Sequence, residues 1–161
     1  PPAAGALAPL VAGTLVGIWQ EEAIFRGLLW RALEPGGPRQ ATVVTALLFG
    51  AIHLGIVVLG GPLEAAVPLV ISGACAGLMY GAIRARTRSI WPTIGLHALW
   101  NLSAQIATAE TSDLLMLVMN LAVTFGFAGY GLFLLRRGGA AAREPAQRVA
   151  AEAPAQEGGA R

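Results

Sequence analysis

The sequence predicts an all-α protein, a polytopic transmembrane bundle of about five helices with a disordered C-terminal tail. Hydrophobic residues make up 55% of the 161 residues and charged residues only 12%. A soluble domain carries roughly 25% charged residues, so this chain lacks the polar side chains to cover a water-facing surface. The charges are also unevenly placed, because Glu64 is the only one between Gln40 and Ile83. These observations exclude a soluble domain, a disordered chain and a coiled coil.

Five apolar segments approach the roughly 20 residues that a helix needs to cross the hydrocarbon layer. They cover Ala3–Leu33, Pro38–Leu59, Leu63–Ile83, Ile90–Ala107 and Asp113–Leu135. The first is long enough to project from the bilayer or to break. Pro38 and Pro92 fall in first turns, which tolerate proline, and Ser89 is a candidate cap. Pro68 predicts a kink or a later start of the third segment.

The charges in the connections predict how the helices are oriented. Basic residues lie in the first and third connections and after the last segment; they are Arg31, Arg39, Arg84, Arg86, Arg88, Arg136 and Arg137. The second connection carries no charge, and the fourth carries only acidic residues. The positive-inside rule requires this alternation of five consecutive spans. We therefore expect a multi-pass protein of the cell membrane, with residues 1–135 as the embedded core and residues 136–161 as a cytoplasmic tail.

Further features restrict the function and predict the packing. The single cysteine, Cys75, excludes an intrachain disulfide, and the clustering of arginines at segment ends gives no nucleic-acid-binding surface. Residues 1–9 contain neither Met nor a basic residue, so we expect a sequence that starts partway into a longer chain rather than a signal peptide. Small residues at four-residue spacing predict close helix contacts. They are Gly73, Gly77 and Gly81, with shorter pairs at Gly13 with Gly17 and at Ala46 with Gly50.

The first segment contains charged residues that cannot face lipid. Near the bilayer centre, Glu21, Glu22 and Arg26 would each cost about 2.5–3.5 kcal/mol on insertion scales. Glu22 and Arg26 stand four residues apart on one helix face, so we expect them to form an ion pair. Glu21 lies about 100° around the helix from Glu22. One carboxylate is therefore expected to be paired, and its neighbour to stay available for chemistry.

Both histidines of the chain lie in apolar segments. His53 follows Phe49 by four residues, and His97 precedes Asn101 by four, so each pair shares a helix face. With a rise of about 1.5 Å per residue, Glu21, His53, His97 and Asn101 lie within roughly 10 Å of one another along the membrane normal. One intramembrane histidine or one Glu–Arg pair is often structural. The joint occurrence at one depth predicts a functional site.

The ordered set Glu21-Glu22-x-x-x-Arg26, Phe49-x-x-x-His53 and His97-x-x-x-Asn101 resembles the CAAX protease and bacteriocin-processing family, also called the Abi family. Its eukaryotic relatives are the type 2 CAAX prenyl endopeptidases. The resemblance runs from about Val16 to Ser103 and implies an intramembrane endopeptidase acting on a peptide or a membrane-anchored protein. It also implies further transmembrane helices upstream of the double-glutamate helix.

The resemblance implies a role for each motif residue. Glu21 would activate the attacking water as general base, and His53 would hold the same water. His97 and Asn101 would donate hydrogen bonds to the developing oxyanion, and the neighbouring Glu–Arg pair would position the first-helix carboxylate. Such chemistry suits a poorly hydrated bundle, which needs a base, a bound water and preorganised donors.

The cofactor is open between none and Zn²⁺. The family is commonly named as metalloproteases, and Glu21, His53 and His97 would be a plausible zinc set. The helix-borne His-Glu-x-x-His signature is absent, however, and a zinc-bound His97 could not also donate to an oxyanion. We favour a metal-free water activated by glutamate.

Two other classes of function compete with the protease. The first is a catalytically inactive membrane immunity, scaffold or sensor protein that uses the polar cluster for packing. The second is a transporter whose Glu and His residues relay protons or metal. A transporter of this kind typically shows inverted repeats of discontinuous helices, and no repeat is evident in the sequence.

Overall fold

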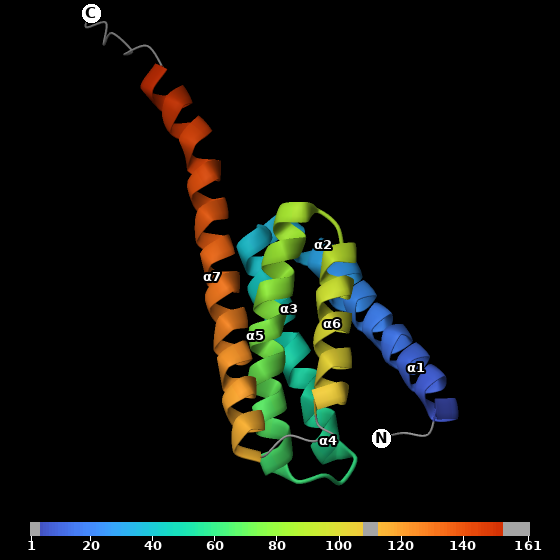
Figure 1. Ribbon diagram of the computed structural model, residues 1–161. Coiled ribbons are helices and arrows are strands. Elements are labelled where there is room, and N and C mark those ends of the chain that lie inside the picture. Colours follow the sequence, from blue (N-terminus) through green and yellow to red (C-terminus); the bar gives the residue numbers. More distant parts are fainter. Residues whose placement is uncertain (1–3, 108–112, 153–161) are drawn as a thin grey trace, which may run out of the picture.

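The computed structural model describes residues 4–107 and 113–152, and these residues form helices without strands. The predicted all-α bundle is therefore confirmed. Helix α5 (Leu63–Thr87) packs most extensively against α3 (Pro38–Ala51) and α7 (Asp113–Glu152). Helix α6 (Trp91–Ala107) runs beside them, and α1 (Ala4–Glu22) crosses at an angle so that its beginning points away from the bundle (Figure 1).

The first predicted segment is one helical run with a change of hydrogen bonding inside it. Helix α1 passes into a π-helical stretch at Ala23–Leu29 and then into the single turn α2 (Trp30–Leu33). A 3₁₀ turn at Glu34–Gly36 follows, and Gly37 leaves it with a φ of 99°, a value that glycine adopts without strain. The segment therefore breaks its regular α-helical pattern at the level of the charged residues, and π-helical turns of this kind occur often at functional sites.

The second predicted segment also changes pitch near its histidine. Helix α3 ends at Ala51, a 3₁₀ turn covers Ile52–Leu54, and α4 covers Gly55–Val58. Helix α5 begins at Leu63, so Pro68 lies within it and does not delay its start. At the next helix, the backbone N–H of Trp91 donates to the Ser89 hydroxyl at 3.3 Å, which confirms the predicted cap.

Glycines set the spacing between α3 and α5. A Cβ on Gly77 would lie 2.8 Å from Ala46 Cα, and a Cβ on Gly81 would lie 2.8 Å from Thr42 Cγ2. The predicted close contact at this ridge is confirmed. Among the residues that the structure describes, a Cβ at Gly13 or Gly17 would meet nothing within 4 Å, so these residues do not form the close contact expected of Gly13 and Gly17. This part of α1 leans away from the other helices (Figure 1).

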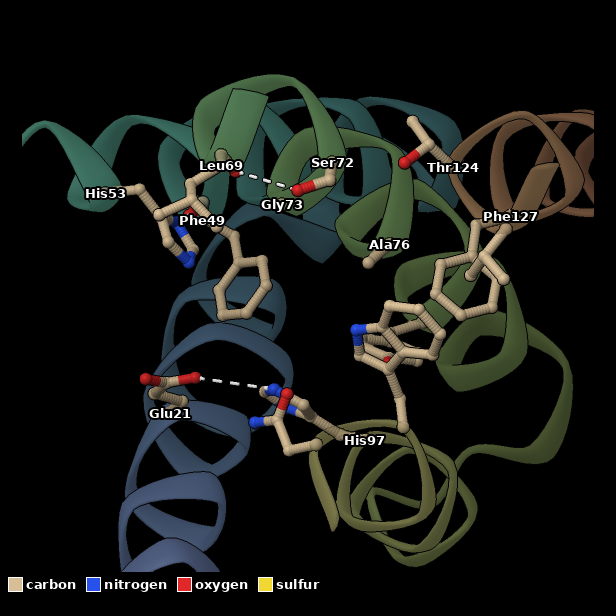
Figure 2. A pocket seen from close by; sticks show the side chains of 14 residues that line it. Glu21, Phe49, His53, Leu69, Ser72, Gly73, Ala76, His97, Thr124 and Phe127 are labelled. Atoms are coloured by element: carbon tan, nitrogen blue, oxygen red, sulfur yellow. Dashed lines mark hydrogen bonds and ion pairs between the residues drawn. The ribbon is translucent and has the colours of Figure 1, made fainter. Parts of the chain in front are cut away.

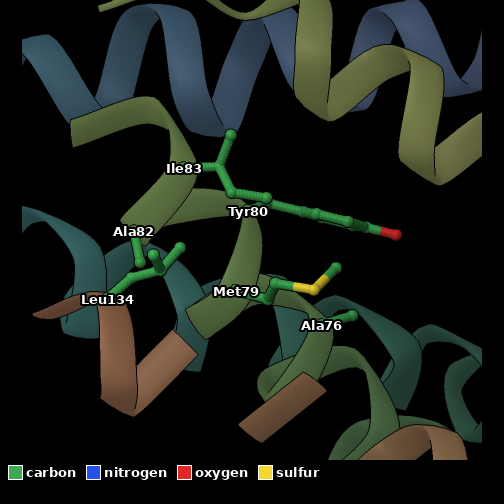
Figure 3. Packing of buried hydrophobic residues seen from close by; sticks show 6 residues of the cluster. All are labelled: Ala76, Met79, Tyr80, Ala82, Ile83 and Leu134. Carbon is green, nitrogen blue, oxygen red and sulfur yellow. The ribbon is translucent and has the colours of Figure 1, made fainter. Parts of the chain in front are cut away.

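A cluster of buried apolar residues joins α5 to α7 (Figure 3). It contains Ala76, Met79, Tyr80, Ala82, Ile83 and Leu134. Gly131 brings the two backbones together, since a Cβ there would lie 2.9 Å from the Met79 nitrogen. Outside these contacts, α7 exposes large apolar side chains such as Phe125 and Leu132, as a lipid-facing helix does.

Helix α7 does not end at Leu135, where the sequence predicted the last span to stop. It continues to Glu152, through a stretch in which Ala, Arg and Glu favour a helix while Gly138, Gly139 and Pro145 oppose one. The last apolar span ends at Arg137, and the division into an embedded core of residues 1–135 and a tail from residue 136 stays a prediction. The end of the predicted disordered tail, residues 153–161, lies outside the described residues.

Three helices of the described chain are long and apolar enough to cross a membrane. They are Pro38–Val58, Leu63–Thr87 and Val118–Arg137. The membrane character of the protein rests on these helices, and the crossing of α1 and α6, which completes the predicted five spans, stays a prediction.

Candidate active site

A cavity of about 160 Å³ lies among α1, α5, α6, α7 and the end of α3. Four of the six predicted site residues line it, namely Glu21, His53, His97 and Asn101. Figure 2 shows Glu21 and His53 on facing walls with the Phe49 ring beside them, and a dashed line joins Glu21 to His97. The helices thus bring together the side chains that the sequence placed at one depth.

The other two predicted residues, Glu22 and Arg26, do not line the cavity and form the expected ion pair. Arg26 Nη1 donates to Glu22 Oε1 at 2.8 Å, and both side chains are fully buried. The guanidinium carbon lies 4.3 Å from the centre of the Phe49 ring and 5.1 Å from that of Tyr80. Aromatic faces attract such a cation, so the rings supplement the single carboxylate that faces Arg26.

His97 stands between the two glutamates. Its Nδ1 lies 3.1 Å from Glu22 Oε1, and its Nε2 lies 3.7 Å from Glu21 Oε2. A carboxylate that pairs with arginine is ionised and only accepts, so Nδ1 carries a proton and donates it to Glu22. A histidine held in this way has a fixed ring orientation and presents Nε2 to the cavity.

The two neighbouring glutamates differ in exposure as expected. The Glu22 side chain is completely buried, whereas the Glu21 side chain is 40% exposed and faces the cavity. No carboxylate–arginine contact within 4 Å involves Glu21 among the described residues. Glu21 is therefore the carboxylate that a water or a substrate in the cavity can reach.

His53 is fixed by its own helix and by a glycine. Its Nδ1 lies 3.0 Å from the Phe49 carbonyl oxygen, which only accepts, so this nitrogen is the donor. Nε2 then keeps its lone pair. A Cβ on Gly73 would lie 2.9 Å from His53 Cε1, so the imidazole fits against α5 because residue 73 has no side chain.

A zinc site would need Glu21, His53 and His97 to converge on one point. Among the residues that the structure describes, no three His, Cys, Asp or Glu side chains form a group that could hold a metal ion. The proposed set of Glu21, His53 and His97 shares the cavity but does not converge as ligands. Cys75 is not among the lining residues.

Sequence reasoning missed several residues of the cavity. Tyr80 is fully buried, and its ring stacks on His97 with centres 5.3 Å apart and planes at 29°. Its hydroxyl oxygen has no hydrogen-bond partner among the described residues. The remaining missed residues are Leu69, Ser72, Gly73, Ala76, Trp100, Val123, Thr124 and Phe127. The helical spacing of Gly73, Ala76 and Tyr80 could have indicated one face of α5, but it gave no sign that this face meets histidines.

Comparison with known proteins identifies the family. Residues 3–103 match the family model described as type II CAAX prenyl endopeptidase Rce1-like. No match was found among curated proteins, and none among solved structures. The matched region contains Glu21, Glu22, Arg26 and both histidines. It covers more than half of the chain. The chain therefore belongs to the type II CAAX prenyl endopeptidase Rce1-like family of membrane proteases.

Proposed function

We propose that this chain is an intramembrane endopeptidase that hydrolyses a peptide bond with a water activated by Glu21. The observation that carries the proposal is the cavity, in which a reachable carboxylate faces His53, His97 and Asn101 within an apolar bundle. Membership of a protease family supports the reaction class. Such a reaction needs a base and preorganised hydrogen-bond donors, and the polar side chains that line the cavity support these roles.

In the proposed reaction, Glu21 takes a proton from water while the water oxygen attacks the carbonyl carbon. The other O–H of that water donates a hydrogen bond to His53 Nε2. The resulting oxyanion receives hydrogen bonds from Asn101 and from His97 Nε2. The latter can donate only while the ring carries both protons, because Nδ1 is bound to Glu22. Glu21 then delivers its proton to the leaving nitrogen as the C–N bond breaks.

Glu22 and Arg26 act as positioning residues in this scheme. Glu22 accepts from Arg26 and from His97 through the same oxygen, so it ties α1 to α6 at the level of the cavity. Such a fixed second layer holds reacting groups in a productive geometry. The carboxylate of the preceding residue, Glu21, is held on the same turn.

The substrate we propose is a peptide or a membrane-anchored protein, with processing of a bacteriocin-like leader peptide as the more specific form. The protein would be a multi-pass protein of the cell membrane with its arginine-rich connections in the cytoplasm. Cysteine labelling tests this topology in a Cys75→Ala background. Arg86→Cys and Gly61→Cys should react from opposite sides of the membrane, and reaction from one side would exclude the five-span arrangement.

The activity itself is tested with purified protein in lipid nanodiscs and a library of membrane-anchored peptides. Glu21→Gln keeps the shape of the side chain but removes the base, and a positioned base contributes roughly 10²–10⁴ in rate. We expect its cleavage, and that of His53→Ala, to fall to background while both variants still fold. Parental cleavage by Glu21→Gln would favour the inactive immunity or scaffold protein, in which the Glu22–Arg26–His97 contacts serve packing alone.

Metal dependence is tested on the parental protein. A metal-free mechanism requires that exhaustive chelation leave cleavage unchanged. Loss of cleavage that added zinc restores would assign Glu21, His53 and His97 as ligands, and would show that they move together from the positions described above.

A further inference from the structure

A second pocket, separate from the active-site cavity, lies where α2 ends and α5 turns into α6. It has a volume of about 540 Å³ and shares no lining residue with the first. Its lining consists of Ala23, Gly27, Leu28, Arg31, Arg84, Arg88, Ser89, Ile90 and Trp91. Three arginines and no acidic residue line it, at the end of the bundle that carries the basic connections (Figure 1).

Arg84 forms the buried base of this pocket. The residue is only 5% exposed, its Nε donates to the Arg26 carbonyl at 3.1 Å, and its guanidinium carbon lies 4.6 Å from the Trp30 ring centre. The ion pairs within 4 Å that the described residues form involve only Glu21, Glu22, Arg26 and His97. Among the described residues, Arg84, Arg31 and Arg88 therefore make no ion pair within 4 Å, and the charge of Glu34 acts on Arg84 only from farther away. The buried guanidinium of Arg84 thus has no anion in contact with it, and a buried charge is stabilised by such a contact.

The backbone at the rim supports a site that needs a cationic side chain. Arg88 has a φ of 54° and is the one non-glycine residue with a positive φ in the described ranges. Glycine is the residue that relieves strain at such a helix end, yet an arginine is present and lines the pocket. Residues of the first turn of α6, Ser89 to Trp91, form the adjoining wall, and a helix N-terminus adds partial positive charge.

The remaining walls are apolar and open to the outside. Leu28 is 69% exposed and Trp91 is 68% exposed. Tryptophan is enriched at membrane–water interfaces, and basic pockets between helices on the cytoplasmic side suit lipid headgroups. A free phosphate ion would use the arginines alone, whereas a lipid would use both kinds of wall.

We propose that this pocket binds the headgroup phosphate of an anionic membrane phospholipid. The phosphate lies among Arg31, Arg84 and Arg88, and an acyl chain follows Leu28 and Trp91. The bound lipid places an anion in direct contact with Arg84, on which Glu34 acts only from beyond 4 Å. Because Arg84 also holds the Arg26 carbonyl in the π-helical stretch, binding stabilises the turn from which Arg26 reaches Glu22.

The test uses the full chain in a neutral detergent with short-chain phosphatidylglycerol as the probe. Native mass spectrometry measures the bound lipid, and the shift of the thermal unfolding midpoint gives an independent readout. Each of Arg31→Gln and Arg88→Gln, which change exposed residues, should weaken binding about fivefold. Arg136→Gln removes the same charge outside the pocket and is the matched control, for which we expect parental affinity. Arg84→Gln should remove binding. If this variant fails to fold, Arg31→Gln and Arg88→Gln still test the proposal.

Three results would overturn the proposal. Equal affinity of the pocket variants and Arg136→Gln would show that the lipid binds elsewhere or without specificity. Binding of glycerol phosphate as tightly as phosphatidylglycerol would assign the pocket to a free phosphate and leave no role for the apolar wall. Binding of a peptide with a free C-terminal carboxylate, without binding of phosphatidylglycerol, would assign the pocket to a peptide terminus. None of these outcomes depends on cleavage activity.

Discussion

Glu21 and Glu22 are adjacent in the sequence, yet they belong to two different regions of the molecule. Glu22 lies in a buried layer where Arg26 and His97 both contact its Oε1, whereas Glu21 faces a cavity that solvent or substrate can enter. A turn of about 100° per residue is enough to separate the two environments. The comparison teaches that one helix can carry a structural charge and a reactive one side by side, provided that an arginine one turn later stabilises only the first.

The largest expected change in the free energy of unfolding comes from a substitution in the buried layer. Arg26→Ala leaves the Glu22 carboxylate buried without its cation, which typically costs about 3–5 kcal/mol. Glu21→Gln alters a partly exposed group and should change the free energy of unfolding by no more than about 0.5 kcal/mol. Denaturant titration of the purified proteins in micelles measures both values.

A double variant serves as the control for Arg26→Ala. Glu22→Gln combined with Arg26→Gln removes both charges, so it should be less destabilised than the single change. If Arg26→Ala unfolds at the parental midpoint, the pair does not lie in a buried layer, and the contrast between the two glutamates is lost.

The sequence predicted the buried layer well because its information is local. Residues four apart on a helix must share a face, so the contact between Glu22 and Arg26 followed from spacing alone. The common depth of Glu21, His53 and His97 followed from helix rise. The contact of His97 with both glutamates could not be predicted, since rise gives the depth of a side chain but not the rotation of its helix.

Other features depend on which helices become neighbours, and spacing does not determine this. Gly77 and Gly13 belong to similar small-residue patterns, but within the described part of the chain a helix packs against Gly77 and none against Gly13. The π-helical stretch after Glu22 left no signal in the pattern of apolar residues. In the sequence, Tyr80 is indistinguishable from an ordinary core aromatic residue. The structure shows that its ring stacks on His97 of α6.

The next smaller effect is expected on turnover, and it tests the role of Asn101 in the cavity. Asn101→Ala should lower turnover by about 10²–10³, equivalent to about 2.7–4 kcal/mol, because one donor to the oxyanion is lost. Cleavage should stay measurable, unlike that of Glu21→Gln. Ser72→Ala is the matched control, since this cavity-lining hydroxyl already donates to the Leu69 carbonyl at 3.3 Å; we expect turnover within about twofold of the parent. Equal losses in the two variants would mean that Asn101 only fills space.

The smallest expected effect concerns the glycine that seats His53. A methyl group at Gly73 would meet His53 Cε1 at 2.9 Å and Nδ1 at 3.0 Å, so the imidazole must move or lose its bond to the Phe49 carbonyl. Overpacking of this kind costs about 1–3 kcal/mol. We expect Gly73→Ala to lower the free energy of unfolding by that amount, and to slow cleavage because His53 Nε2 leaves the position from which it holds the water.

Gly13→Ala separates this steric effect from the general effect of replacing glycine in a helix. A Cβ at Gly13 meets nothing within 4 Å, and alanine favours a helix over glycine by about 1 kcal/mol, so this variant should be as stable as the parent or slightly more stable. Equal stability of the two alanine variants would contradict the close approach of α5 to His53. Loss of stability at Gly73 with unchanged cleavage would contradict a role for His53 in holding the water, because the ring cannot both yield to the methyl group and keep its place in the cavity.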